Sequence, residues 1–471
     1  MLSGDCVANR SGGIGYAPPM LLPIDELRPE FERALDVSSR LVVPPETGAG
    51  KSTRVPAWLA DRFDGLILVV EPRRVACHAL AEFLAGERKE AVGAFFGSRV
   101  RFADRSGSET RVLFCTPGVA LRMLADSQFV PSAIVVDEFH ERSWQMDLVV
   151  AAVASLPRLR DLPLILTSAT IDADAAAAAL GAETLHATGR TFPVEVLYVG
   201  QGIEPNAQDI GSRVAPVIER ALRDHPGDVL VFLPGMREIR AVETALERGS
   251  EEVLIVHGSQ PPEAMRRVFQ ASDRRRIYLA TNVAETSLTV PGIRYVIDPG
   301  SARISRYSYR SKVQRLPIEA VSQASANQRA GRCGRVANGI CIRLYSEEDY
   351  LGRPEFTDPE ILRTNLASVI LKMLALGLGD INDFPFVQAP DPRFITDGYR
   401  LLEELQAIKL QAKRREQPTL SALGKQIARL PIDPRYARMV IAAQQHNALN
   451  EVVIITAGLS IQDPKERPAD K

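Results

Sequence analysis

The chain has 471 residues, of which 45% are hydrophobic and 24% charged, a balance typical of a globular protein with about two to four domains. Its formal net charge of −1 excludes recruitment to nucleic acid or to a membrane surface by overall charge, so any basic surface must be local. Apolar runs of membrane-spanning length, a signal peptide and CxxC pairs among the five cysteines are all missing, so we expect a cytoplasmic protein without structural zinc or disulfides.

Residues 1–18 are rich in Gly, Ser and Pro and predict a flexible leader. Beyond them, short apolar runs alternate with longer helical patterns such as residues 75–86. Near-continuous apolar runs are typical of strands buried on both faces, as in a parallel sheet covered by helices. The runs in the first half are RLVVPP (40–45), LILVVEP (66–72), RVLFCTP (111–117), AIVVDE (133–138) and LILTSAT (164–170).

The series pauses near residues 189–200 and then restarts, which predicts a second α/β domain. After residue 351 the pattern becomes helical, and residues 358–377 begin with Asp and Pro and end with Gly, as a bounded helix does. We therefore expect an α/β fold with two tandem parallel-sheet domains, over 19–190 and 191–350, and a smaller α-rich region. The second set of strands is DVLVFLPG (228–235), EEVLIVHGS (251–259), RRRIYLATN (274–282), RYVIDPG (294–300) and GICIRLYS (339–346).

The segment PPETGAGKST, residues 44–53, lies between a predicted strand and a predicted helix. It nearly matches the phosphate-binding loop GxxxxGK[ST], with Pro45 in place of the first glycine. The remaining glycines let backbone N–H groups surround phosphate oxygens, Lys51 reaches the β- and γ-phosphates, and Ser52 offers a hydroxyl to Mg²⁺. The alternative is a Gly-rich turn with a surface lysine, which the flanking strand and helix disfavour.

Two carboxylates follow the predicted strand AIVV, namely Asp137 and Glu138. Ligands of open α/β sheets bind at the carboxyl ends of the strands. One carboxylate of such a pair can hold a metal ion while its neighbour activates a water molecule. Alone the pair would indicate a solvated loop, but together with a phosphate-binding loop it indicates hydrolysis of a nucleoside triphosphate.

Basic residues concentrate between residues 301 and 335, where eight Arg or Lys accompany one acidic residue. The alternation of charged and apolar residues over 303–316 indicates a β-hairpin with one basic face, although the pattern alone favours a solvated edge ribbon. The segment QRAGRCGR, residues 328–335, repeats arginine every third position, which on a helix would place all three on one face. Without further context that helix would be predicted to bind nucleic acid.

Taken in chain order, these motifs resemble those of the DEAH-box helicases of superfamily 2, over residues from about 38 to 471. The second half is most similar to the bacterial HrpA-type enzymes, whereas DEFHERS is closer to their HrpB-type relatives. The resemblance implies an ATP-dependent RNA helicase in which two RecA-like domains clamp ATP and Mg²⁺ and act on single-stranded RNA or RNA–protein complexes. The motifs that carry it are PETGAGKST, EPRRVA, FCTPG, DEFH, SAT, ATNVAETSLTVPG and QRAGRCGR.

The resemblance also implies catalytic roles. Arg332 and Arg335 would contact the γ-phosphate, and Gln328 would position the attacking water. His140 would couple the acidic motif to the second domain, and Ser168 with Thr170 would link hydrolysis to domain movement. The catalytic set is Lys51, Asp137, Glu138, His140, Gln328, Arg332 and Arg335, and the metal set is Ser52, Asp137 and Glu138.

Binding residues follow in the same way. Phe269 matches an aromatic residue that stacks on the base, while Phe83 stands where the family often has a base-stacking arginine. Phe139 replaces the alanine of the DEAH motif, and Pro291 replaces an acidic residue of many members. The nucleotide would bind to Thr47, Gly48, Ala49, Gly50, Lys51, Ser52, Thr53 and Phe269, and the nucleic-acid backbone to Arg73, Arg74, Thr116, Gly118, Thr281 and Asn282.

The C-terminal part resembles a winged helix over residues 351–422 and the first part of a ratchet domain over 423–471. The family's OB-fold has no counterpart in the sequence, so we expect a C-terminally truncated member that hydrolyses ATP. Two alternatives remain: a DNA translocase with the same motor, and a nucleotide-gated nucleic-acid-binding module with weak turnover.

Overall fold

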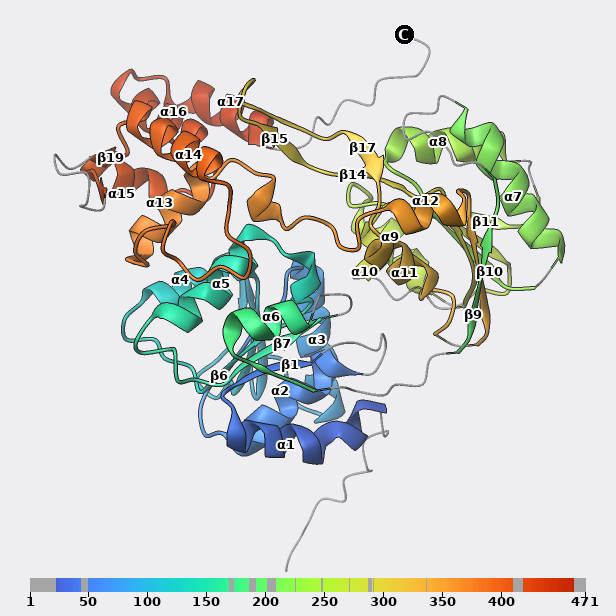
Figure 1. The fold of residues 1–471 in the computed structure, drawn as a ribbon, viewed down its shortest axis with the longest axis horizontal. Coiled ribbons are helices and arrows are strands. Elements are labelled where there is room, and N and C mark those ends of the chain that lie inside the picture. Colours follow the sequence, from blue (N-terminus) through green and yellow to red (C-terminus); the bar gives the residue numbers. More distant parts are fainter. Residues whose placement is uncertain are drawn as a thin grey trace, which may run out of the picture.

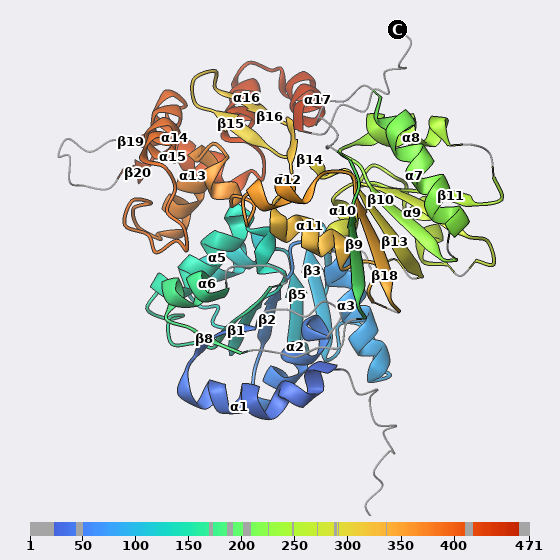
Figure 2. The same cartoon turned by 45° about the vertical axis from the view of Figure 1, so that its right-hand side comes forward.

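The computed structural model describes residues 23–43, 50–168, 173–185, 192–200, 209–224, 226–246, 249–270, 272–286, 290, 292–335, 337–409 and 418–460. Two sheet-containing domains lie side by side, and a helical C-terminal unit lies over the α4–α5 side of the first domain (Figures 1 and 2). This arrangement confirms the predicted fold class. Among the described helices, none is long and apolar enough to cross a membrane.

The first domain contains a sheet with strand order β4-β3-β5-β2-β6-β7-β1-β8, whose neighbours are parallel except β3 with β4. All five strands predicted for this domain are present. The strands β3, β4 and β8 were not predicted because their residues are mostly polar or small. The strands are β1 Arg40–Val43, β2 Ile67–Val70, β3 Phe96–Val100, β4 Ala103–Arg105, β5 Val112–Cys115, β6 Ala133–Val136, β7 Leu164–Thr167 and β8 Glu183–Thr184.

Helices cover both faces of this sheet because the buried strands are apolar at successive positions. In β1, Leu41 and Val43 pack toward α1, α2 and α3, whereas Val42 packs toward α4 and α5. The helical elements are η1 Pro23–Leu27, α1 Arg28–Val37, α2 Lys51–Arg62, α3 Arg74–Glu87, α4 Pro117–Ala125, η2 Phe139–Glu141, α5 Trp144–Ser155 and α6 Ala173–Leu180.

The second domain contains a parallel sheet with strand order β11-β12-β10-β13-β18-β9. All five predicted strands are confirmed, and the region where the series pauses holds an additional edge strand, β9. The strands are β9 Val194–Tyr198, β10 Asp228–Phe232, β11 Glu252–Val256, β12 Arg276–Ala280, β13 Ile293–Asp298 and β18 Gly339–Arg343. The helices are α7 Ile210–Asp224, α8 Met236–Ala245, α9 Pro262–Phe269, α10 Val283–Thr286, α11 Gln323–Ala330 and α12 Glu347–Gly352.

The predicted hairpin extends from the second domain toward the C-terminal unit (Figure 1). Its outer part pairs β15 (Arg306–Ser308) with β16 (Val313–Arg315), and its root pairs β14 (Ser301–Arg303) with β17 (Ile318–Ala320). The side chain of Asp397 in the C-terminal unit anchors the outer part. It accepts a hydrogen bond of 2.7 Å from the Tyr307 hydroxyl and forms an ion pair with Lys312.

The C-terminal unit contains the elements η3 Glu360–Leu362, α13 Ala367–Leu376, α14 Pro392–Glu404, β19 Ile408–Lys409, β20 Thr419–Leu420, α15 Ala422–Arg429, α16 Pro434–Gln445 and α17 Leu449–Ser460. The helix predicted over 358–377 ends as expected, at Gly377 with φ of 64°. Its predicted start is wrong. Glu360 accepts a hydrogen bond from the Trp144 backbone and donates one to the Arg142 carbonyl, which holds this part of the chain in a short 3₁₀ turn.

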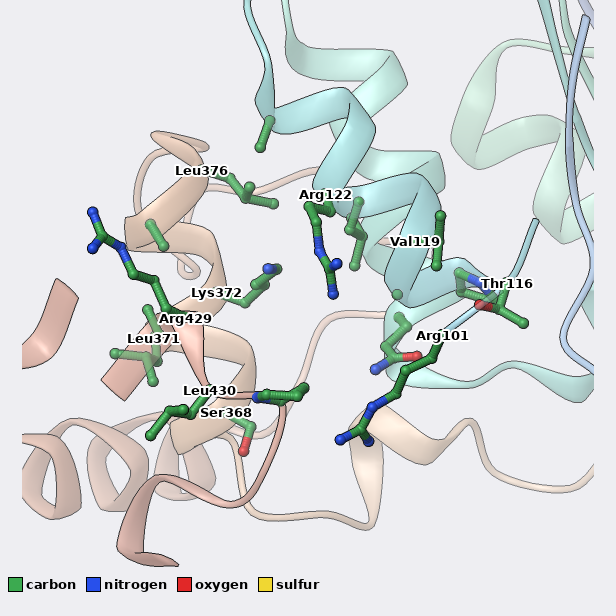
Figure 3. Close-up of a pocket in the computed structure, with 18 of the residues that line it drawn as sticks. Arg101, Thr116, Val119, Arg122, Ser368, Leu371, Lys372, Leu376, Arg429 and Leu430 are labelled. Carbon is green, nitrogen blue, oxygen red and sulfur yellow. The ribbon is translucent and has the colours of Figure 1, made fainter. Parts of the chain in front are cut away.

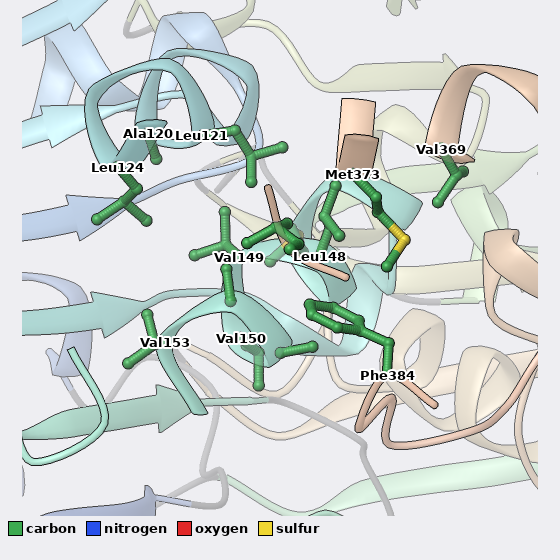
Figure 4. Close-up of a cluster of buried hydrophobic side chains, with 14 of the residues drawn as sticks. Ala120, Leu121, Leu124, Leu148, Val149, Val150, Val153, Val369, Met373 and Phe384 are labelled. Atoms are coloured by element: carbon green, nitrogen blue, oxygen red, sulfur yellow. The ribbon is translucent and has the colours of Figure 1, made fainter. Parts of the chain in front are cut away.

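One hydrophobic cluster joins the first domain to the C-terminal unit. Figure 4 shows Leu148 and Val149 of α5 facing Met373 of α13, with Phe384 beside them. The second domain has hydrophobic clusters of its own. The first domain and the C-terminal unit therefore share one hydrophobic core, whereas the second domain has a separate core.

Candidate nucleotide and nucleic-acid sites

Gly50, in the segment expected to bind phosphate, caps the N-terminus of α2 with φ of 89°, a conformation that favours glycine. The first backbone N–H groups of α2 point out of its N-terminal end, as they do at anion sites at helix N-termini. Lys51 Nζ lies 3.5 Å from the carbonyl oxygen of Ser168, so it reaches the carboxyl end of β7. Thr47, Gly48 and Ala49, as well as Thr170 and Pro291, lie outside the described residues.

Asp137 follows β6 at the centre of the first sheet and is 1% exposed. Its Oδ1 accepts hydrogen bonds from the Thr167 hydroxyl and, at 3.0 Å, from the Glu138 backbone N–H. Its Oδ2 is buried and has no hydrogen-bond partner among the described residues. A buried anionic oxygen without a donor suits a hard divalent cation, so the site fits Mg²⁺ with Ser52, on the first turn of α2, as a second oxygen ligand.

Glu138 and His140 form the adjacent pair, with His140 Nε2 lying 3.3 Å from Glu138 Oε2. Burial, followed by the Asp137 charge, raises the pKa of Glu138 to about 7, although Lys51 and Arg332 act in the opposite direction. Burial, together with Lys51 and Arg332, lowers the pKa of His140 to about 3. The imidazole is therefore neutral at physiological pH, while Glu138 is poised to exchange a proton near neutrality.

The helix α11 ends at Ala330, so the three arginines of QRAGRCGR do not share a helical face. Arg332 is 6% exposed, and burial together with Arg335 lowers its pKa to about 9. Glu138 partly offsets this effect for both arginines, which places their guanidinium groups near Glu138 across the domain interface. Gln328 lies on α11 and is 5% exposed.

Arg329 has a different environment, which sequence reasoning missed. It is 1% exposed, and its guanidinium lies 2.7 Å from Asp298 and 3.0 Å from Glu285. It also lies over the Phe232 ring, 4.8 Å from the centroid. This arginine therefore fixes the motif to β13 and α10 within the second domain. One feature of the sequence could have indicated this role: three closely spaced arginines need more than one kind of anionic partner.

Three of the residues expected to hold nucleic acid, Arg74, Thr116 and Gly118, line a cavity of about 2200 Å³ between the first domain and the C-terminal unit (Figure 3). Arg73 instead lies between the two sheet domains. It forms a 2.9 Å ion pair with Glu141 and a 3.1 Å hydrogen bond to the Val283 carbonyl.

The remaining expected residues lie on the second domain or at the nucleotide motifs. Thr281 is buried at the end of β12, and the adjacent Asn282 is exposed. Phe269, at the end of α9, and Phe83, on α3, are 47% and 54% exposed, so both rings are accessible to a base. Ser168 is 2% exposed at the end of β7.

Comparison with known proteins is consistent with these sites. The family model "Helicase conserved C-terminal domain" matches residues 213–337, and "Helicase associated domain (HA2), ratchet-like" matches residues 433–471. The chain is 48% identical over 465 residues to ATP-dependent RNA helicase HrpA of Escherichia coli (strain K12), covering 96% of this chain and 36% of that protein. The homologue from Haemophilus influenzae is 46% identical with the same coverage.

Among solved structures, that of the E. coli DEAH/RHA helicase HrpB is similar with a TM-score of 0.83 and 33% identity, over 95% of this chain and 57% of that one. A structure of the E. coli DExH-box NTPase HrpB is similar with a TM-score of 0.81 and 32% identity, over 96% of this chain and 56% of that one. The chain thus spans about a third of the length of the curated HrpA relatives. By sequence and fold, the chain is HrpA/HrpB-like: nearly its whole length is similar to part of these DEAH-box helicases.

Proposed function

We propose that this chain hydrolyses ATP between its two RecA-like domains and uses the resulting domain movement to translocate in the 3′-to-5′ direction on single-stranded RNA. The observation that carries this proposal is the convergence of Glu138 from the first domain with Arg332 and Arg335 from the second. Hydrolysis at such a site requires the domains to close, which couples chemistry to movement.

The residues of the first domain would bind and activate the reactants. Lys51 and the backbone N–H groups at the start of α2 would hold the β- and γ-phosphates, and Thr53 belongs to the same turn. Ser52 and Asp137 would hold Mg²⁺, which neutralises phosphate charge when bound. Glu138 would accept the proton of the attacking water.

The residues of the second domain would stabilise the transition state. The guanidinium groups of Arg332 and Arg335 would contact oxygens of the transferring phosphoryl group, where negative charge is spread. Gln328 would orient the attacking water. Neutral His140, which lies 3.3 Å from Glu138, would position that carboxylate and transmit its movement toward the second domain.

The cavity beside Arg74, Thr116 and Gly118 would hold the nucleic-acid strand, with Thr281 and Asn282 continuing the path on the second domain. The hairpin of β15 and β16 would separate strands at its tip.

Residues 19–190 and 191–350 would form the two RecA-like domains, with the winged helix over 351–422 and the ratchet region from 423. From the resemblance to DEAH-box helicases, RNA–protein complexes are the proposed targets of remodelling.

Unwinding of tailed duplexes tests the proposal, with Glu138→Gln as the inactive control. Duplexes with a 3′ single-stranded RNA tail should be separated in an ATP-dependent reaction, whereas the same duplexes with a 5′ tail should not. Separation from the 5′ tail alone would refute the proposed direction. Equal activity on tailed DNA would identify a DNA translocase, and ATP-dependent strand binding without turnover would identify a nucleotide-gated binding module.

A further inference from the structure

The cavity between the first domain and the C-terminal unit carries an excess of positive charge that the nucleotide motifs do not explain. Six basic residues that line the cavity form no ion pair within the part of the chain that the structure describes. They are Arg74, Arg101, Arg122, Lys372, Lys425 and Arg429. They come from both walls. The first three belong to the first domain, and the last three to α13 and α15 of the C-terminal unit.

The acidic side chains that line the same cavity already have partners. Asp104 lies 2.8 Å from Arg99, and Glu141 lies 2.9 Å from Arg73. Asp433 caps α16 by accepting a 2.8 Å hydrogen bond from a backbone N–H. The protein therefore supplies little negative charge to neutralise the cavity's cations.

Lys372 and Arg122 are the most informative of these residues. Figure 3 shows both side chains pointing into the same space, from α13 and α4 respectively. Burial lowers the pKa of Lys372, and the neighbouring guanidinium of Arg122 lowers it further. A half-buried ammonium beside another cation is unfavourable in the free protein, and an anion placed between the two groups would reverse that penalty.

We propose that Arg122 and Lys372 bind the phosphodiester backbone of the single strand from opposite walls of this cavity. This inference rests on the proposed function, because Thr116 and Gly118, at the start of the same helix as Arg122, line the cavity too. The two walls share one hydrophobic core, so they hold the strand as a fixed unit. The strand is thereby retained while the second domain moves during each ATP cycle.

The test is the salt dependence of binding of the full chain to a fluorescent oligouridine RNA. Lys372→Met keeps the aliphatic stem and removes the charge. It should weaken binding about tenfold. It should also lower the slope of log K against log salt by about 0.7, the value for one phosphate contact of a single strand. Arg122→Gln should do the same, whereas Lys372→Arg should bind as the unmodified chain does.

The matched control is Arg220→Ala, an exposed arginine on α7 whose loss should leave the slope unchanged. Thermal unfolding of each variant checks the fold, and Lys372→Met should be no less stable because it relieves repulsion from Arg122. An unchanged affinity and slope in folded Lys372→Met would overturn the inference while leaving the proposed function intact. Absence of RNA binding by the unmodified chain would overturn the proposed function itself. Binding of poly-glutamate that depends on Lys372 as strongly would overturn the assignment to a nucleic-acid backbone.

Discussion

Two arginines of QRAGRCGR, Arg329 and Arg332, should respond to substitution in opposite ways. Arg329→Met removes the guanidinium from Asp298, which is 0% exposed, and from Glu285, whose side chain is 12% exposed. Breaking a buried ion pair by removing one partner costs about 3–5 kcal/mol. Because the Tyr345 hydroxyl and the Gly300 N–H still donate to Asp298, at 3.0 Å and 2.9 Å, we expect the lower half of that range.

Thermal unfolding at one scan rate measures the effect, since a loss of about 3–4 kcal/mol lowers the midpoint of a domain of this size by roughly 6–16 °C. Arg332→Met is the control within the same motif. Burial and Arg335 lower the pKa of Arg332 to about 9, so the folded state disfavours its charge and the neutral variant should be as stable as the parent or more so. A midpoint for Arg329→Met within about 2 °C of the parent would refute the structural role of Arg329.

Three further outcomes follow from the sites. Because the pKa of Glu138 is raised to about 7 and only its carboxylate form accepts a proton, ATP turnover should fall with decreasing pH below about 7; a flat profile from about pH 6 to 8 would contradict this. Phe269→Ala removes an exposed ring and should raise the KM for ATP about tenfold with little change in kcat, measured by phosphate release, and an unchanged KM would exclude stacking. Asp397→Asn weakens the anchor of the hairpin at Tyr307 and Lys312, so duplex separation should drop more than RNA-stimulated turnover; an equal drop in both would argue against a strand-separating hairpin.

The strands could be predicted from the sequence wherever burial on both faces leaves a nearly continuous apolar run. The edge strand β9 was not predicted because it is partly solvated, and its residues alternate between half-buried and exposed. The strand β3 lies inside its sheet and is mostly buried, but its sequence FGSRV contains no continuous apolar run. The start of α13 escaped for another reason, since contacts of Glu360 with Arg142 and Trp144 override the local helical pattern.

The nucleotide motifs could be proposed from the sequence because phosphate chemistry restricts both residue type and spacing. The separate roles of the arginines within these motifs could not be predicted from the sequence. Nothing in QRAGRCGR distinguishes the buried Arg329 from Arg332, because the distinction depends on Glu285 and Asp298, which lie elsewhere in the chain. Arg73 likewise matches a nucleic-acid motif but contacts Glu141 and the second domain.

The most direct measurement is steady-state ATP turnover of the 471-residue chain with and without single-stranded RNA, beside Arg332→Ala. A site completed by residues of both domains predicts turnover that RNA stimulates in the parent chain and that is lost in the variant. Turnover by Arg332→Ala equal to that of the parent would contradict the proposal that the second domain contributes to catalysis.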